Sequence, residues 1–116
     1  MTAITDSIGA IPVLSNLPDE ASALKLAQLI IAQHLAACVN ILAPCTSIYQ
    51  WQGKTETASE VPLLIKTTQQ CYPALQALIL SQHPYELPEI IHVTVDGGLN
   101  AYLQWLAATT KMESLS

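Results

Sequence analysis

Residues 36–68, AACVNILAPCTSIYQWQGKTETASEVPLLIKTT, contain two stretches rich in β-branched and aromatic residues that predict neighbouring β-strands. The first stretch, Ala36–Trp51, is expected to bend or bulge at Ala43–Cys45, because its central proline cannot donate a ladder hydrogen bond. The second strand is expected at Glu60–Thr68. A turn predicted at Gln52–Lys54 makes the two strands an antiparallel hairpin that projects beyond a sheet of shorter strands.

The sequence before this hairpin predicts a strand and a helix. Ser7–Ser15 is apolar enough for a strand, which Pro12 is expected to shorten or bulge. The segment Asn16–Glu20 supplies cap-forming side chains, a proline and acidic residues, which are typical of a helix N-terminus. We expect this helix to end near His34 and to bury one stripe of residues, namely Leu24, Ala27, Ile31 and Leu35.

The sequence after the hairpin predicts a second helix, a fourth strand and a short terminal helix. Tyr72-Pro73 is expected to open the second helix and Pro84 to close it. The alternation of Ile90–Val95 predicts a last core strand. Asn100 is placed to cap the terminal helix. The residues expected to pack inward from these two helices are Leu75, Leu78, Ile79, Gln82, Leu103, Leu106 and Ala107.

The predicted order of elements is strand, helix, strand, strand, helix, strand, which is the split βαβ or ferredoxin-like arrangement. The fold class is therefore α+β, with an antiparallel sheet, two helices on one face, a long hairpin and an extra C-terminal helix. Residues 1–116 are expected to form a single domain with a core at about residues 8–110. The open backbone edges of the hairpin predict pairing with another subunit.

Composition disfavours several classes of protein. Only 11% of the residues are charged and 51% are hydrophobic, which is too apolar for a disordered chain and favours a buried subunit interface. The net charge of -5 disfavours nucleic-acid binding. The sequence shows neither a membrane-spanning stretch nor a signal-peptide pattern, so we expect a cytoplasmic protein. The odd set of cysteines, without a CxxC pair, predicts reduced and buried thiols at Cys38, Cys45 and Cys71.

The segment His83–Glu89, HPYELPE, concentrates polar functional side chains around two prolines. The imidazole of His83 and the carboxylates of Glu86 and Glu89 suit a divalent metal such as copper or zinc, and the same groups could do acid–base work. The alternative is a rigid connection between helix and strand, whose polar side chains hydrogen-bond to the backbone. The residues alone leave both interpretations open.

Aromatic residues and one lysine point to a cleft or to an interface. Tyr49 and Trp51 lie two residues apart on the long strand, so they share a face and could wall a ligand pocket with Trp105. Aromatic residues are also enriched at buried subunit contacts, which is the interpretation we favour. Lys66 follows an apolar run, and its amine is expected to reach a polar cleft or to form an ion pair with Glu60, Glu86 or Glu89.

Six blocks of the sequence together resemble one protein family. They are Pro18-Asp19-Glu20, LAACVNIL (35–42), SIYQWQGK (47–54), LLIKTT (63–68), HPYELPEI (83–90) and AYLQWL (101–106). Their order and spacing are similar to those of CutA proteins, the family named for divalent cation tolerance. The resemblance implies a ferredoxin-like subunit in a compact homotrimer joined through strand edges, and a link to copper and other divalent metals. It implies no catalytic reaction.

The chain departs from the copper ligands proposed for bacterial members of this family. The resemblance places those ligands at a Cys that ends the first strand and at a His-His pair, which correspond here to Ser15, Gln82 and His83. Only His83 remains a strong donor, which implies weak binding of Cu(II) or another divalent cation, with Glu86 and Glu89 as helpers and no required cofactor. Three further departures are expected to disturb the strands: Pro12, Cys45 and Pro62.

Two hypotheses for function follow. The first is a cytoplasmic homotrimer that is linked to divalent metal tolerance and binds metal ions weakly. The alternative is a PII-like regulatory trimer that binds a small-molecule ligand in intersubunit clefts lined by Tyr49, Trp51, Lys66 and Tyr85. We do not expect an enzyme, because the sequence shows no nucleophile beside a base.

Overall fold

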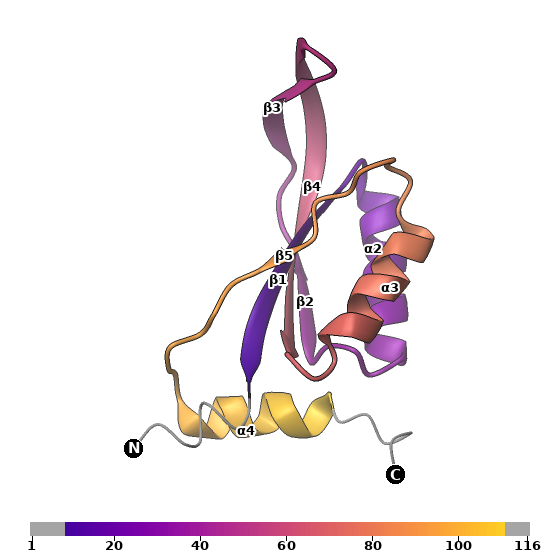
Figure 1. Ribbon diagram of the computed structural model, residues 1–116. Coiled ribbons are helices and arrows are strands. Elements are labelled where there is room, and N and C mark those ends of the chain that lie inside the picture. Colours follow the sequence, from indigo (N-terminus) through magenta and orange to yellow (C-terminus); the bar gives the residue numbers. More distant parts are fainter. Residues whose placement is uncertain (1–8, 111–116) are drawn as a thin grey trace.

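The computed structural model describes residues 9–110 as a mixed α+β structure (Figure 1). The strands form one antiparallel sheet in the order β2-β4-β1-β5, and β3 pairs with the far end of β4. This order confirms the predicted ferredoxin-like arrangement. The elements are β1 (Ala10–Leu17), α2 (Glu20–Ala32), β2 (Cys38–Ile41), β3 (Cys45–Trp51), β4 (Lys54–Thr68), α3 (Tyr72–Gln82), β5 (Ile91–His92) and α4 (Asn100–Thr109).

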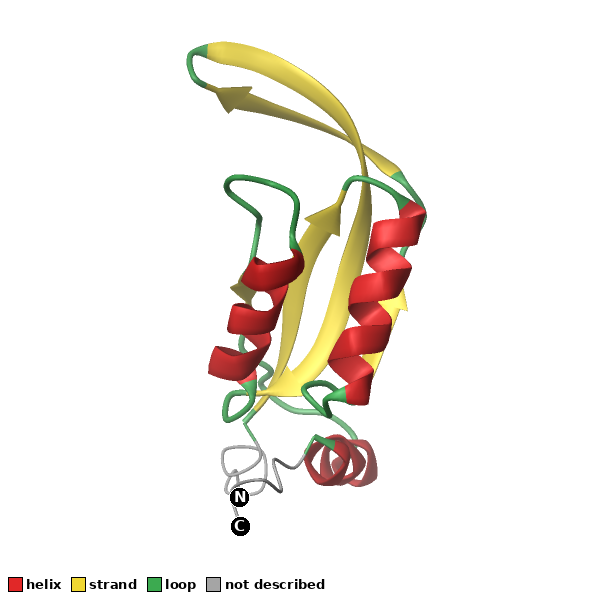
Figure 2. Ribbon diagram, turned by 90° about the vertical axis from the view of Figure 1, so that its right-hand side faces the viewer, coloured by secondary structure: helices red, strands yellow, loops and turns green. Residues whose placement is uncertain are grey.

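The long strand β4 organises the sheet. Its second half pairs with β1, from Leu17↔Val61 to Ala10↔Thr68, and with β2 on the other side. Its first half pairs with β3, so the β3–β4 hairpin extends away from the helices, as Figures 1 and 2 show. The predicted projecting hairpin is therefore confirmed. Its second strand begins at Lys54, earlier than the predicted Glu60, because pairing with β3 keeps these polar residues extended.

The predicted bend in the first hairpin strand is a complete break between β2 and β3. Cys38–Ile41 pairs with residues 63–66 of β4, and Cys45 resumes pairing opposite Glu60. Pro44 lies in the gap and Pro62 lies opposite it, so two proline nitrogens that cannot donate coincide with the interruption. Pro12 causes no such break, since β1 runs through it.

Helices α2 and α3 cover one face of the sheet side by side (Figure 2) and enclose the main core. Asp19 caps α2: its carboxylate accepts hydrogen bonds from the Ser22 backbone N–H at 2.8 Å and from the Ser22 hydroxyl at 2.6 Å. Both bonds lower the pKa of Asp19, and the bond to the Ser22 side chain has the larger effect. The core strands contribute alternate residues, which include Ile11, Val13, Leu17, Val61, Leu63 and Ile65.

The predicted buried stripe of α2 is confirmed for Ala27 and Leu35 and wrong for Leu24 and Ile31, which are exposed. Beside Ala27, the helix buries Ala23, Leu26 and Ile30. The sequence EASALKLAQLIIA is apolar on more than one face, so periodicity by itself does not choose the inward side. The choice is made by the sheet, because Ala23, Leu26 and Ile30 join its strand residues in the main core.

The last predicted strand is present, but it is shorter than the predicted Ile90–Val95 and lies at the edge of the sheet. Only Ile91–His92 forms a strand, β5, and Ile91 is 50% exposed. Two residue pairs, Val13↔His92 and Leu14↔Ile91, join β5 to β1 at the edge of the sheet. The alternation along Ile90–Val95 correctly located a strand. Because this strand lies at the edge of the sheet, Ile91 and Val93 are exposed to solvent in a single chain.

The terminal helix α4 crosses the end of the sheet (Figure 1), where Leu103 and Leu106 pack against Ala10 in a second small core. Leu99 holds the N-cap position and no side chain caps the helix, so the prediction of an Asn100 cap is wrong. Residues 7 and 8 of the first predicted strand lie outside the described part of the chain. In the described part, no helix is long and apolar enough to cross a membrane.

None of the three cysteines is joined to another. Cys71 is buried and its thiol donates to the Thr110 carbonyl at 2.8 Å, which ties α4 to the start of α3. Cys38 is half-buried, whereas Cys45 is exposed at the start of β3. The prediction that all three thiols are buried is therefore wrong for Cys45, because the break in the strand places it outside the helix-covered part of the sheet.

Candidate functional site

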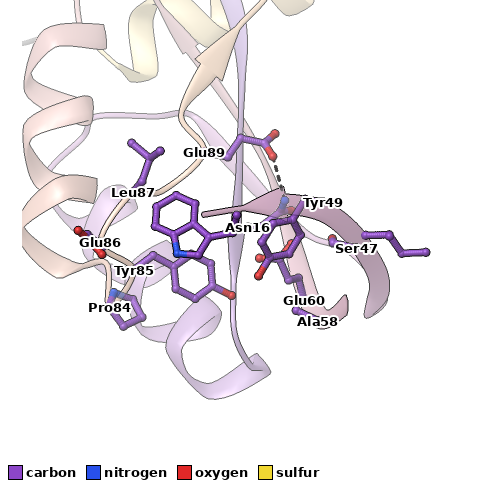
Figure 3. Close-up of a pocket in the computed structure, with 12 residues that line it drawn as sticks. Asn16, Ser47, Tyr49, Ala58, Glu60, Pro84, Tyr85, Glu86, Leu87 and Glu89 are labelled. Atoms are coloured by element: carbon purple, nitrogen blue, oxygen red, sulfur yellow. Dashed lines mark hydrogen bonds between the residues drawn. The ribbon is translucent and has the colours of Figure 1, made fainter. Parts of the chain in front are cut away.

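A cavity of about 760 Å³ lies where the β3–β4 hairpin leaves the body of the molecule (Figure 3). The end of β1, the facing strands of the hairpin and the loop after α3 form its walls. The residues that line it are Asn16, Ser47, Ile48, Tyr49, Trp51, Ala58, Glu60, Pro84, Tyr85, Glu86, Leu87 and Glu89. Its size falls within the range of about 300–1,000 Å³ that is usual for small-molecule sites.

This cavity unites parts of two sites that the sequence suggested separately. It contains Tyr49, Trp51 and Tyr85 of the predicted ligand cleft together with Glu86 and Glu89 of the predicted metal site. Alternation along β3 directs the Tyr49 and Trp51 side chains to one face of the hairpin. One chain thus brings five of the predicted site residues to one cavity, whereas His83 and Lys66 lie outside its lining.

Lys66 lies outside the lining of this cavity. It is paired with Pro12 and Cys38 in the middle of the sheet. It lies six positions along β4 from Glu60, which is about 20 Å at the rise of an extended chain. The predicted ion pair between Lys66 and Glu60 is therefore wrong within one chain.

His83 links the loop after α3 to β1. Its Nε2 lies 2.7 Å from the Asn16 carbonyl oxygen, and its Nδ1 lies 3.2 Å from the Tyr85 backbone nitrogen. The backbone N–H of Tyr85 must donate, so Nδ1 accepts and Nε2–H donates to Asn16. Both ring nitrogens of the neutral imidazole are engaged. The geometry matches the alternative interpretation of this segment, a connection that polar side chains hold to the backbone.

Asn16 holds the other end of the same loop, and the sequence reasoning did not single it out for this role. Its side-chain amide donates to Glu89 Oε1 at 3.0 Å, while its carbonyl oxygen accepts from His83. One residue of β1 therefore positions both ends of the loop that carries Tyr85 and Glu86. No local pattern could reveal this, because Asn16 is 67 and 73 residues away from its partners.

The donor groups do not form a metal centre within one chain. Across residues 9–110, no three His, Cys, Asp or Glu side chains lie close enough to hold a metal ion together. Ser15 is buried with an unpartnered hydroxyl, and Gln82 is exposed at the end of α3. The ring nitrogens of His83 already have hydrogen-bond partners. The described residues therefore do not fit a resident metal, and ligation by His83, Glu86 and Glu89 stays a prediction.

Tyr85 and the buried Glu60 lie together in the cavity. Glu60 is only 8% exposed although its side chain is a carboxylate. The pKa of Tyr85 is raised to about 12. Burial is the largest cause, and the hydrogen bond to Glu60 and the negative charge of Glu60 add to it. The phenol therefore stays neutral at physiological pH and can donate to the carboxylate. A signal for Glu60 existed in the sequence: a carboxylate directly before the apolar run VPLLI of a core strand.

Comparison with known proteins identifies the family. The model of the family described as CutA1 divalent ion tolerance protein matches residues 11–109. Protein CutA of Homo sapiens is 43% identical over 97 residues, which are 84% of this chain and 54% of the human protein. The divalent-cation tolerance protein CutA of Citrobacter koseri is 42% identical over 102 residues, 88% of this chain and 89% of that protein. The chain thus spans about half the length of the human and mouse relatives.

Solved structures agree with the sequence relatives. CutA from Xylella fastidiosa superposes with a TM-score of 0.86 at 39% identity, covering 89% of this chain and 99% of that one. CutA1 from Oryza sativa gives 0.85 at 38% identity, covering 88% and 94%. Both superpositions therefore cover most of the chain. Since the family model and these relatives cover most of its length, the chain belongs to the CutA1 divalent ion tolerance protein family.

Proposed function

We propose that this protein acts in divalent-metal tolerance as a homotrimer and binds divalent cations, Cu(II) among them, only weakly, without a resident cofactor and without catalysing a reaction. The observation that carries the proposal is the family match over residues 11–109. Relatives that are about 42% identical bear the name divalent-cation tolerance protein. The metal class comes from that name, the number of three subunits comes from the family resemblance, and the weakness of binding is inferred from the donor groups of the chain.

The surface of one chain supports assembly. Large apolar side chains are exposed on the hairpin, on the loop and near the C-terminal helix, with Ile48 at 70% and Leu87 at 71%. Only 11% of all residues are charged, so the chain has few charges with which to cover a monomer. The hairpin edge and the β5 edge also offer backbone groups for pairing. Burial of these features in a closed ring of three chains would remove them from water.

Weak metal binding follows from the chemistry of the donors. His83 can ligate a metal only if a ring nitrogen gives up a hydrogen bond to the backbone of Asn16 or Tyr85. The carboxylates of Glu86 and Glu89 are hard oxygen donors, and Glu89 is already bonded to the Asn16 amide. Copper prefers thiolate and imidazole ligands. This set therefore supports transient contact with a cation rather than a permanent site.

We also propose a cytoplasmic location. An exposed, unpaired Cys45 suits a reducing compartment, where thiols persist. The CutA structure from Archaeoglobus fulgidus is described as that of a periplasmic protein. Fusion of the chain to a reporter enzyme that folds only in the periplasm should give no activity, and clear activity would contradict this location.

A growth assay tests the metal role directly. Cells that lack their own family member should tolerate less Cu(II) than the parent strain does. Expression of this chain should restore growth at the higher Cu(II) concentrations. NaCl at matched ionic strength is the control for general stress. If expression leaves Cu(II), Zn(II) and Co(II) sensitivity unchanged while the protein accumulates normally, the proposed function is wrong. The PII-like alternative is not favoured: the family is named for divalent ion tolerance, and Lys66 lies outside the cavity that contains Tyr49, Trp51 and Tyr85.

A further inference from the structure

The cavity beside the hairpin has a strongly one-sided charge. Among the described residues that line it, Glu60, Glu86 and Glu89 are carboxylates and none is Lys, Arg or His. Glu60 is 8% exposed, so most of its charge is shielded from water. Taking a carboxylate out of water without a positive partner is costly. The electrostatics of the lining therefore favour a cation as occupant.

The hydrogen bond from Tyr85 leaves the charge of Glu60 in place. Tyr85 lies beside Glu60 (Figure 3), and its phenol is a neutral hydrogen-bond donor at physiological pH. A neutral donor satisfies one lone pair of the carboxylate and cancels none of its charge. Glu60 therefore keeps acceptor capacity and negative charge towards the cavity that it lines.

The spread of the carboxylates disfavours a bare metal ion. Glu60 comes from β4 and Glu86 from the loop after α3, and in Figure 3 the ring of Tyr85 lies between them. No group of three His, Cys, Asp or Glu side chains within residues 9–110 can hold one metal ion. The intervening walls are the aromatic faces of Tyr49, Trp51 and Tyr85, which bind methylene groups and attract ammonium groups through cation–π contacts. Separate negative charges joined by aromatic surface match an extended organic cation.

We propose that this cavity binds an aliphatic di- or triamine. One ammonium group contacts the Glu60 carboxylate at the inner end, and a second ammonium group contacts Glu86 at the loop. The methylene chain between them packs on Tyr49 and Trp51. This inference rests on the lining and stands independently of the metal role. Ile48 and Leu87 also line the cavity and are among the residues that the proposed trimer would bury, so the cavity is tested in the native assembly.

Titration calorimetry of the full chain in its native assembly, with spermidine as the probe, tests the proposal. We expect one spermidine per chain, and affinity about tenfold or more weaker in Glu60→Gln, because a charged hydrogen-bond partner is lost. Glu56→Gln is the matched control: it removes the same charge from the same strand, outside the cavity lining. It should bind as the parent does. Mg²⁺ and neutral 1,8-octanediol should each fail to compete.

Three results would overturn the proposal: no spermidine binding by the parent, equal losses in Glu60→Gln and Glu56→Gln, or displacement of spermidine by Mg²⁺ at the same concentration. A parent that binds no spermidine and a Glu60→Gln variant that changes mass by light scattering would instead show a partner chain over the cavity. A second readout avoids reliance on the Glu60 variant. Trp105→Phe leaves Trp51 as the one tryptophan of the chain. The fluorescence of Trp51 should change when spermidine is added and should stay constant when octanediol is added.

Discussion

His83 shows how a residue that suits a metal by type can be held by its backbone neighbours. Its two ring nitrogens bridge Asn16 and Tyr85, so any copper ligation competes with these hydrogen bonds. Cys45, exposed on β3, is the strongest rival donor, because thiolates bind soft metals more tightly than imidazole does. The two residues make opposite predictions for the same measurement.

His83→Ala is expected to weaken Cu(II) binding, and Cys45→Ser is expected to leave it unchanged. Affinity should also fall at acid pH, since a protonated imidazole cannot ligate. Calorimetric titration of each variant, without reductant and with correction for thiol oxidation, measures the effect. If His83→Ala binds Cu(II) as well as the parent while Cys45→Ser does not, the metal site lies at the thiol.

Tyr85 should remain a neutral phenol far into the alkaline range. Burial and the Glu60 carboxylate raise its pKa to about 12, above the ordinary value of 10.0. The folded state then holds the proton more tightly than the unfolded state, so this contribution to stability is complete below about pH 10 and is lost as pH rises towards about 12. The difference between the ultraviolet titration curves of the parent and of Tyr85→Phe isolates the ionisation of the Tyr85 phenol. In Glu60→Gln the same difference should shift towards lower pH, and no shift would disprove the coupling.

At the scale of the element, helix α2 offers a paired test of which side it buries. Ile30 is fully buried and its neighbour Ile31 is 41% exposed. Ile30→Ala should lower the free energy of unfolding by about 2–5 kcal/mol, through lost burial and a residual cavity. Ile31→Ala should change it by less than about 0.5 kcal/mol. Denaturant unfolding measures both, and equal losses would show that assembly or another contact buries Ile31.

The turn of the hairpin tests backbone strain without steric interference. Gln52 and Gly53 both have positive φ, 51° and 81°, between the paired Trp51 and Lys54, which is the pattern of a two-residue I′ turn. A Cβ at Gly53 would meet nothing within 4 Å. Gly53→Ala should therefore cost about 1 kcal/mol through conformation alone. Gln52→Asn should be neutral or stabilising. Hydrogen exchange of the hairpin amides is the measurement, and unchanged protection in Gly53→Ala would contradict the turn assignment.

At the scale of the whole molecule, the projecting hairpin predicts how chains assemble. Light scattering coupled to gel filtration should give about 37.5 kDa, three times the 12.5 kDa of one chain. Ile48→Lys, on the exposed hairpin, should shift the mass towards the monomer because it places a charge at a buried contact. Leu24→Lys, on the outer side of α2, is the control and should leave the mass unchanged. A parent that stays monomeric at micromolar concentration would refute the trimer.

Local chemistry in the sequence determined the order of the elements, the hairpin and the helix starts. Proline at residue 44 predicted the bend in the hairpin strand, Gln52-Gly53 predicted the tight turn, and Asn16–Glu20 predicted the start of α2. Each of these signals depends on residues within a few positions of one another. The six family blocks added the fold and the metal class over most of the chain.

Tertiary structure alone decided which faces are inside and which distant residues meet. The stripe of α2 depended on the sheet beneath it, and the exposure of Ile91 depended on its place at the edge of that sheet. The cavity needed β1, the hairpin and the loop after α3 to converge, and Asn16 joined that loop to β1 across 67 and 73 residues. Such contacts carry no local pattern, because the energy of a side chain depends on neighbours that the chain brings together only when it folds.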